Sequence, residues 1–230
     1  MISNKNKAIF VHIPKVAGQS IETMFLKELG LDWNKRAGLL LRKKKAFEKG
    51  PLRLAHLRAR DYVDYGYIDE DSFNDYYKFS FVRNPYKRVF SFYNFLGYSK
   101  IISINTFIMK VLPLKVEKGD FFLMSQYDYL FNSEGDLMVD YVGKFENINI
   151  DITEVIKFTG LKNSMLPHVN KSKGEWKRAL SQLIKSPYLL RYIGFKKDSN
   201  NNFEKVFTQD LKNQVYNIYQ KDFHYFNYER

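Results

Sequence analysis

The sequence contains no cysteine among its 230 residues. This absence excludes disulfides, a thiolate nucleophile and cysteine-ligated zinc or iron–sulfur sites, and it agrees with a reducing compartment. The sequence also lacks any apolar run of about 18 residues, the length that a transmembrane helix needs. Its opening stretch, MISNKNKAIF, lacks the hydrophobic core of a signal peptide. We therefore expect a cytoplasmic protein that is not exported.

Internal repeats, low-complexity tracts and linkers rich in proline, glycine or serine are also missing. A chain of this length can build one sizeable core, so we predict a single domain over residues 1–230. The hydrophobic fraction of 45% and the aromatic fraction of 17% exclude a disordered chain. The sequence therefore predicts a globular protein.

The charge is strongly one-sided, with 37 basic against 25 acidic side chains and a net charge of +12. An excess of this size favours an anionic ligand, polymer or membrane surface as partner. The densest basic run is RKKK at residues 42–45. We interpret it as a solvated helix face, with contact to an anionic acceptor or to lipid headgroups as the alternative.

Residues 9–29, IFVHIPKVAGQSIETMFLKEL, change from a strand pattern to a helix pattern. The first part is a short, nearly continuous apolar run, which is typical of a parallel strand buried on both faces. From Ser20 onward the apolar residues recur at helical spacing and form one stripe. They are Ile21, Met24, Phe25 and Leu29. The strand is therefore predicted to turn directly into a helix.

The residues between this strand and helix suit a phosphate or sulfate group. Lys15 supplies a cation, Gly18 lets a ligand approach the backbone, and Ser20 and Thr23 supply hydroxyls beside the positive end of a helix. The segment is not a Walker A loop, because that loop has a second glycine directly before its lysine. An ordinary turn with a solvated lysine is the alternative interpretation.

Residues 77–96, YKFSFVRNPYKRVFSFYNFL, repeat the design with different chemistry. Arg83 follows a predicted buried strand, and Pro85 suits the first position of the next helix. Ser91 lies about two turns into that helix, off its apolar stripe. Since ligands of open α/β sheets bind at the carboxyl ends of strands, Arg83 and Ser91 predict a second anion site.

Two such segments together resemble a known family. HIPKVAGQS resembles the 5′-phosphosulfate loop, and RNPYKRVFSFY the 3′-phosphate motif, of sulfotransferases that use 3′-phosphoadenosine-5′-phosphosulfate (PAPS). The closer resemblance is to the carbohydrate branch, which includes heparan sulfate 2-O-sulfotransferase and many bacterial members. DYVGKFENINIDI at residues 140–152 and LPHVNKSK at residues 166–173 extend the likeness. No motif is recognised in residues 30–50 and 98–122.

The resemblance implies a three-layer α/β/α architecture with a central parallel sheet, the P-loop nucleotide-kinase-like sulfotransferase fold. The residues agree, because strand patterns near residues 9, 79 and 142 are each followed by a helical pattern. Asp151 and Glu154 predict the start of the third of these helices, and Gly160 its end. We interpret Glu146 and Asn147 as part of the turn before it.

The resemblance also implies roles for single residues. Lys15 binds the 5′-phosphate and stabilises the leaving oxygen, so it counts as catalytic. The donor-binding residues implied are Lys15, Val16, Ala17, Gly18, Gln19, Ser20, Arg83, Ser91, Asn170, Lys171 and Ser172. The family loop more often reads Lys-Thr-Gly-Gly-Thr-Ser. The residues here therefore remove two hydroxyls and a glycine, and they shift anion binding toward the backbone N–H groups. Lys173, Lys177 and Arg178 could extend a basic rim.

The acceptor hydroxyl needs a base, and the chain has four histidines. We choose His56, which follows a short strand-like run and has the pKa range for taking a proton near neutral pH. His168 is the alternative base or an acceptor contact. His12, within the buried strand, and His224, in an aromatic tail, are interpreted as structural.

The sequence therefore predicts an enzyme that moves a sulfuryl group from PAPS to a hydroxyl of a polysaccharide, glycolipid or lipid-linked oligosaccharide. The product is adenosine 3′,5′-bisphosphate (PAP), and no metal is required by in-line transfer. A bacterial enzyme of the cytoplasm or inner membrane face is expected, without specific nucleic-acid binding and with its oligomeric state open. A nucleotide-dependent phosphotransferase ranks low because the Walker A loop is missing. The main alternative is a non-catalytic basic protein that binds nucleic acid or anionic glycan.

Overall fold

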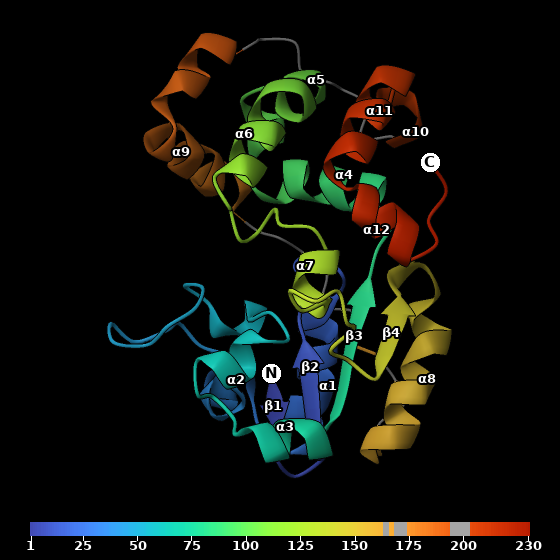
Figure 1. Ribbon diagram of the computed structural model, residues 1–230. Coiled ribbons are helices and arrows are strands. Elements are labelled where there is room, and N and C mark those ends of the chain that lie inside the picture. The colour runs from blue at the N-terminus through green and yellow to red at the C-terminus, as the bar shows by residue number, and fades with distance from the viewer. Residues whose placement is uncertain (163–165, 168–173, 194–202) are drawn as a thin grey trace. The chain divides into compact units, whose positions relative to one another are not determined.

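The computed structural model describes residues 1–162, 166–167, 174–193 and 203–230 (Figure 1). Contacts between Cα atoms group the chain into two compact units. The sheet unit comprises Met1–Arg83 and Gln126–Val169, and the helical unit comprises Asn84–Ser125 and Asn170–Arg230. The single domain expected over residues 1–230 stays a prediction.

The sheet unit contains a four-stranded sheet in the order β1-β2-β3-β4 (Figure 1). Strands β2 (Ala8–Val11), β3 (Tyr77–Val82) and β4 (Tyr141–Lys144) are parallel to one another, as predicted. The short strand β1 (Ile2–Ser3) pairs antiparallel with β2 and was not predicted. The sheet is therefore mixed but mostly parallel, and helices surround it, which confirms the predicted α/β fold class.

Burial explains why these runs form the central strands. Every residue of β2 is buried, and all of β3 except Tyr77 is buried. Phe10 and Phe79 stack across the two strands with ring centroids 5.1 Å apart, and Phe25 of α1 (Gly18–Glu28) stacks on Phe79 at 6.0 Å. The apolar stripe predicted for the first helix thus packs against the sheet.

The remaining helices of the sheet unit are short, apart from α8. They are η1 (Trp33–Leu39), η2 (Leu54–His56), α2 (Asp61–Asp64), α3 (Glu70–Asp75), α7 (Tyr127–Leu130), η5 (Phe145–Asn147) and α8 (Ile148–Thr159). Gly160 ends α8 at φ 64°, where a residue without a side chain is favoured, as predicted.

Two local predictions in this unit are wrong. Asp151 does not start α8, which begins three residues earlier at Ile148, because the Asp151 carboxylate instead accepts the N–H of Lys144 at 2.6 Å. The basic run at residues 42–45 is not a helix face. Lys43 forms an isolated bridge with Arg53, and Arg42 makes two hydrogen bonds of 2.6 and 2.7 Å to the Glu48 carboxylate.

The described part of the helical unit contains helices but no strand. Its helices are α4 (Pro85–Phe95), η3 (Tyr98–Lys100), α5 (Ile104–Thr106), η4 (Phe107–Val111), α6 (Leu112–Glu117), α9 (Glu175–Lys185), η6 (Pro187–Tyr192), α10 (Phe203–Val206), α11 (Gln209–Ile218) and α12 (Gln220–Tyr225). As predicted, Pro85 occupies the first turn of α4, and the Asn84 side chain accepts the N–H of Lys87 as the N-cap.

An arginine lies inside the core of the helical unit. Arg88 is buried, donates to the carbonyl of Met124 at 3.0 Å and lies 3.9 Å from the buried carboxylate of Asp222. Its guanidinium also covers the ring of Phe92 at 4.8 Å. The final helix α12 is thus fastened to α4 by charge as well as by apolar packing.

In the part of the chain that the structure describes, none of the helices is both long and apolar enough to cross a membrane. The same residues contain no group of three or more His, Cys, Asp or Glu side chains placed to hold a metal ion.

Candidate functional site

The candidate site lies at the carboxyl ends of the parallel strands. Val11 of β2 pairs with Ser80 of β3, and Val82 of β3 pairs with Lys144 of β4. The segments that leave these strands therefore begin at the same edge of the sheet. They carry the predicted Lys15 loop and Arg83, together with Phe145. This edge is where open α/β sheets bind their ligands.

The Lys15 loop, residues 14–20, has an unusual backbone. Lys15 and Ala17 both adopt the left-handed conformation, with φ of 73° and 64°, on either side of Val16. Alternation of this kind turns successive N–H groups inward and forms an anion-binding concavity. The loop therefore offers backbone N–H groups at the start of α1, where an anionic phosphate or sulfate group can accept hydrogen bonds.

Side chains of the loop contribute less than its backbone does. Val16 is fully buried and anchors the loop in the core, whereas Gln19 is exposed and Ser20 is half-buried. The left-handed Ala17 costs about 1 kcal/mol relative to the glycine common in the resembling family. Thr23, read from the sequence as a donor to the anion, instead donates its hydroxyl to the carbonyl of Gln19 at 2.7 Å.

Gly18 is required by the close approach of His12. A Cβ atom at Gly18 would lie 1.8 Å from the Nε2 atom of His12, so any larger residue would clash with the ring. Gly18 itself is buried at the first position of α1. The imidazole of His12 thus forms the floor beneath the Lys15 loop.

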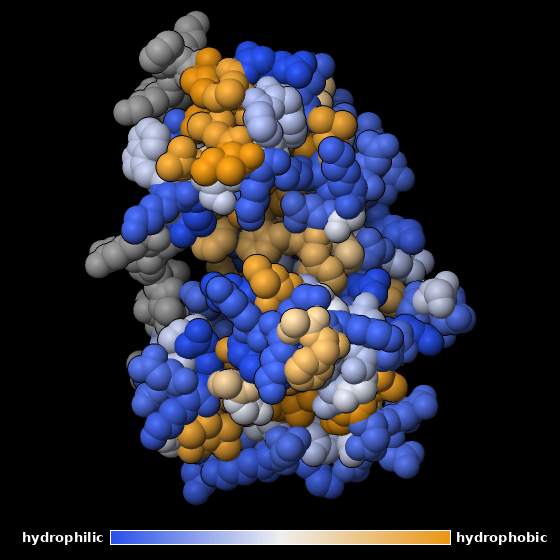
Figure 2. All heavy atoms as spheres, turned by 90° about the vertical axis from the view of Figure 1, so that its left-hand side faces the viewer, coloured by the Kyte–Doolittle hydropathy of each residue, from blue (hydrophilic) through white to orange (hydrophobic). Residues whose placement is uncertain are grey.

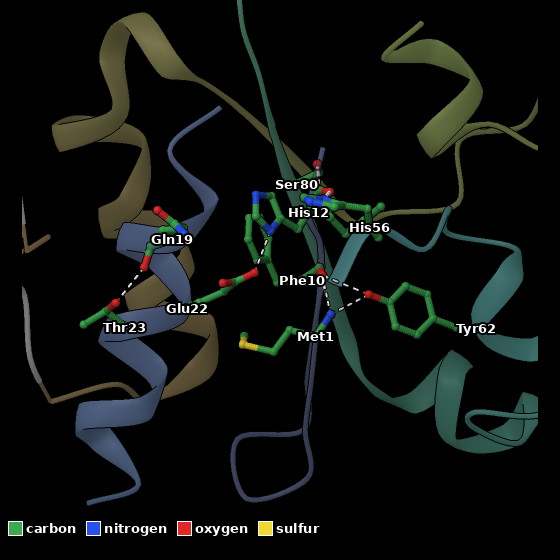
Figure 3. A network of polar contacts seen from close by, with 10 residues as sticks. Met1, Phe10, His12, Gln19, Glu22, Thr23, His56, Tyr62 and Ser80 are labelled. Carbon is green, nitrogen blue, oxygen red and sulfur yellow. Dashed lines mark hydrogen bonds and ion pairs between the residues drawn. The ribbon is translucent and has the colours of Figure 1, made fainter. Parts of the chain in front are cut away.

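A buried carboxylate holds the His12 ring in place. Nδ1 of His12 lies 2.5 Å from Oε1 of Glu22, and both side chains are buried (Figure 3). Glu22 comes from α1 itself, one turn beyond Gly18. Because the hydrogen-bonded carboxylate orients the ring, the pair fixes the distance between β2 and the start of α1. The interpretation of His12 as a structural hydrogen-bonder agrees with these contacts.

His56 is held by the backbone of His12. Its Nδ1 atom donates to the His12 carbonyl at 3.0 Å, and the two rings lie 4.5 Å apart (Figure 3). The bond assigns the proton of neutral His56 to Nδ1, so Nε2 is its acceptor atom. Desolvation by burial and the neighbouring His12 lower the pKa of His56 from 6.5 to about 3. The ring is therefore neutral at pH 7, the form that a general base needs.

The local structure around His56 differs from the prediction. His56 ends the 3₁₀-helix η2, whereas the sequence had indicated a short strand before it. Leu54 of η2 is fully buried and anchors the turn, so burial of one leucine, not sheet pairing, positions the histidine.

Further hydrogen bonds tie β2 to its neighbours beneath the site (Figure 3). The Ser80 hydroxyl donates to the carbonyl of Val11 at 2.7 Å. The carbonyl of Phe10 accepts both the Met1 amino group at 2.9 Å and the Tyr62 hydroxyl at 3.1 Å. Strand β2, which His12 directly follows, is thus hydrogen-bonded on both of its edges.

Arg83, in the second predicted anion-binding segment, contacts the Lys15 loop, which is the first. Its Nη1 atom donates to the carbonyl of Lys15 at 3.3 Å, and its guanidinium lies over the ring of Phe145 at 4.3 Å. Lys15 and Arg83 are both half-buried. Lys15 and Arg83 are therefore adjacent at the carboxyl ends of β2 and β3. The ring of Phe145, which follows β4, packs against the Arg83 guanidinium.

Gln126 fixes the backbone of Arg83 and was missed in the sequence. Its Oε1 atom accepts the N–H of Arg83 at 2.8 Å, and its Nε2 atom donates to the Arg83 carbonyl at 2.9 Å. The side chain is fully buried, so these bonds are shielded from water. The amide thus pairs with Arg83 as a neighbouring strand would. No local pattern signals this role, because Gln126 lies 43 positions away from Arg83.

Replacing Gln126 by leucine is expected to lower the free energy of unfolding by about 2 kcal/mol, because the buried N–H and carbonyl of Arg83 lose their partners. PAP binding should weaken in the same variant, since Arg83 is no longer held in place. Urea unfolding and titration with PAP measure the two effects. The control is Gln220→Leu at an exposed position of α12, where the stability should change by less than about 0.5 kcal/mol. Unchanged stability in Gln126→Leu would contradict this assignment.

Ser91 is half-buried on α4, in the helical unit, whereas Arg83 belongs to the sheet unit. The anion site that the sequence predicts for these two residues stays a prediction. Asn170, Lys171, Ser172, Lys173 and the alternative base His168 lie outside the described residues.

Two further predictions concern the helical unit. Arg178, expected to belong to a basic rim with the exposed Lys177, is half-buried, donates to the carbonyl of Phe95 and stacks on its ring at 4.5 Å. Arg178 is thus a packing residue of α9. His224 is exposed on α12 and contacts the ring of Tyr225, so its interpretation as structural receives little support.

Comparison with known protein families gives a match. The family described as "Sulfotransferase family" matches residues 1–118 and 115–229. The matched ranges include both the Lys15 loop and Arg83. No curated protein matches the chain.

Proposed function

The chain belongs to the sulfotransferase family, and on the geometry of its site we propose that it moves a sulfuryl group from PAPS to a hydroxyl of a carbohydrate acceptor. Members of this family are transferases, and PAPS is the sulfate donor that the family implies. The observation that carries the proposal is the hydrogen bond from Arg83 Nη1 to the Lys15 carbonyl. It joins the two predicted anion-binding segments, as a donor with two phosphate-bearing positions requires.

The Lys15 loop is suited to bind the phosphosulfate group of PAPS. The left-handed residues Lys15 and Ala17 turn N–H groups toward one point, and Gly18 cannot carry a side chain because His12 fills that space. When bound, the donor supplies the sulfuryl group and a phosphate leaving group on which negative charge builds during in-line transfer. Lys15 and the loop N–H groups stabilise that charge, and Arg83 binds the 3′-phosphate.

His56 receives the proton of the acceptor hydroxyl in this proposal. Its Nδ1–H is committed to the His12 carbonyl, so Nε2 carries the lone pair that takes the proton. As the acceptor oxygen bonds to sulfur, the bond from sulfur to the phosphate oxygen breaks, and the proton passes to Nε2. The His12–Glu22 pair keeps the ring that supports both His56 and the loop in one orientation.

Replacing Arg83 by alanine is expected to weaken PAP binding by about 10- to 100-fold, because charge-assisted hydrogen bonds to a phosphate are lost. Binding of 5′-AMP, which has no 3′-phosphate, should change little. Isothermal titration calorimetry measures both. Arg36→Ala, at a half-buried position of the 3₁₀-helix η1 in the sheet unit, should bind PAP as the wild type does. Equal losses for PAP and 5′-AMP in Arg83→Ala would mean that Arg83 does not contact the 3′-phosphate.

The carbohydrate acceptor rests on the resemblance of the two motifs to the carbohydrate branch, and the net charge of +12 suits an anionic polysaccharide. The test is transfer of labelled sulfate from PAPS to a panel of polysaccharides, glycolipids and lipid-linked oligosaccharides. Peptide, phenol and steroid hydroxyls serve as controls. Transfer to a carbohydrate alone supports the proposal, and transfer only to the other hydroxyls would reject this acceptor class.

A bacterial enzyme of the cytoplasm completes the proposal. Its support is the absence of cysteine and the resemblance to a branch with many bacterial members. The alternative, a non-catalytic basic protein, does not explain why the Lys15 loop and Arg83 lie in contact with each other.

A further inference from the structure

Helix α9 carries a stripe of exposed apolar side chains that the described residues of its unit do not cover. Trp176, Leu180 and Ile184 follow one another at intervals of four residues, and their side chains are 64%, 61% and 72% exposed. Side chains at this spacing lie along one face of a helix. In Figure 2 hydrophobic side chains gather over the upper part of the molecule, where α9 lies in Figure 1. A stripe containing an exposed tryptophan is unusual for a surface that meets only water.

The helix is fixed on its unit by a different side. Ala179 is buried, and its backbone packs so closely on Gly97 that a Cβ atom there would lie 2.5 Å from the Ala179 nitrogen. Arg178 is held by the carbonyl and ring of Phe95. Apolar side chains therefore cover more of the α9 surface than the side that packs on its unit, and those beyond this side are exposed.

Exposed apolar side chains also occur at and just after η6, the element that follows α9. Leu190 of η6 is 60% exposed, and Ile193, directly after η6, is 44% exposed. We define the α9 patch as Trp176, Leu180, Ile184, Leu190 and Ile193. The segment from α9 to the residue after η6 thus exposes five large apolar side chains, whereas apolar surface residues that need no explanation occur singly.

The border of the patch is basic. Lys177, Lys185 and Arg191 are all exposed. The acidic residue of residues 174–193 is Glu175, which forms an ion pair with Lys100 at 3.1 Å. The patch therefore combines apolar side chains with three exposed basic residues, for which the described part of the chain shows no ion pair.

We propose that the α9 patch binds the surface of an anionic lipid bilayer. A helix with lysine on its polar border and tryptophan and leucine on its apolar face lies in the bilayer interface, and each basic residue near anionic headgroups adds affinity. A second copy of the chain fits less well, because a two-fold contact would place identical basic borders opposite each other. This inference goes beyond sulfuryl transfer and does not depend on the donor.

Tryptophan fluorescence tests the proposal directly, because the chain has two tryptophans. In Trp33→Phe, Trp176 is the sole reporter. Vesicles made of equal parts phosphatidylcholine and phosphatidylglycerol should shift its emission to the blue, and vesicles of phosphatidylcholine alone should shift it far less. The complementary variant Trp176→Phe, which keeps Trp33, should show no shift.

Co-sedimentation with the same vesicles measures affinity. The double variant Leu180→Ser/Ile184→Ser should partition at least about tenfold more weakly, because two side chains lose apolar burial. Lys185→Gln/Arg191→Gln should weaken binding and its salt dependence together. Ile150→Ser removes an equally exposed side chain, 71% exposed on α8, and should bind as the wild type does.

Three outcomes would overturn the proposal. The first is no blue shift of Trp176 with anionic vesicles. The second is vesicle binding that Ile150→Ser lowers as much as Leu180→Ser/Ile184→Ser does. The third is a dimer in analytical ultracentrifugation that Leu180→Ser/Ile184→Ser converts to a monomer without any change in vesicle binding. Since catalysis enters none of these measurements, they are decided separately from the donor and acceptor assays.

Discussion

In Lys15→Met, sulfuryl transfer is expected to fall by about 100- to 1,000-fold, the usual cost of removing one group that stabilises charge developing in a transition state. Methionine keeps the length of the side chain and removes only the ammonium charge. The left-handed backbone at φ 73° is equally unfavourable for both residues, so the loop should keep its conformation. Initial rates at saturating PAPS and acceptor measure the effect.

The matched control for Lys15→Met lies at the other end of the same helix. Lys27 is exposed in the last turn of α1, and Lys27→Met should transfer sulfate at the wild-type rate. Circular dichroism of both variants verifies folding. If Lys15→Met kept more than about a tenth of the wild-type rate, its ammonium group would not stabilise the leaving oxygen.

In His56→Asn, turnover is expected to fall by about 100- to 10,000-fold, the range for loss of a general base. Asparagine can still donate from its side chain to the His12 carbonyl, so the hydrogen bond that Nδ1 makes at 3.0 Å is preserved while the base is removed. His224→Asn, on the exposed surface of α12, is the control and should remain fully active. Equal activity of the two variants would move the role of base away from His56.

The pH dependence gives a second measure of His56. Burial and the nearby His12 lower its pKa from 6.5 to about 3, so the ring stays neutral, and able to accept a proton, until the pH falls toward 3. The acidic limb of kcat/KM should therefore lie well below pH 6.5, since this parameter reports the free enzyme. The same lowered pKa makes the fold lose stability as the pH falls from 6.5 toward 3. An acidic limb at or above pH 6.5 would contradict the environment described for His56.

The local sequence determined much of the fold. The buried runs of β2 and β3, the stripe of α1, Pro85 at the start of α4 and Gly160 at the end of α8 follow from short-range patterns. In each case the preference of neighbouring residues and the tertiary packing agree. The proximity of the Lys15 loop to Arg83 could also be anticipated, because adjacent parallel strands end at the same edge.

The supporting contacts of the site could not be predicted, because they join residues distant in sequence. Glu22 is a charged residue beside the apolar stripe of the first helix, and the stripe does not predict its burial. Its burial is explained by its contact with His12. Gln126 reads as an ordinary polar residue before its bonds to Arg83 are known. The spacing of Asp151 and Glu154 suggested a helix start. The hydrogen bond that Asp151 accepts from the N–H of Lys144 cannot be inferred from that spacing.

Titration calorimetry of the wild-type chain tests the central claim most directly. The ligands are PAP, ATP with Mg²⁺ and 5′-AMP, measured under the same conditions. Tight binding of PAP with weak or no binding of the other two is the predicted result, because Lys15 and Arg83 are each proposed to bind one of its phosphates. Equal binding of all three, or none, would contradict donor recognition at this site and favour a protein that only binds polyanions.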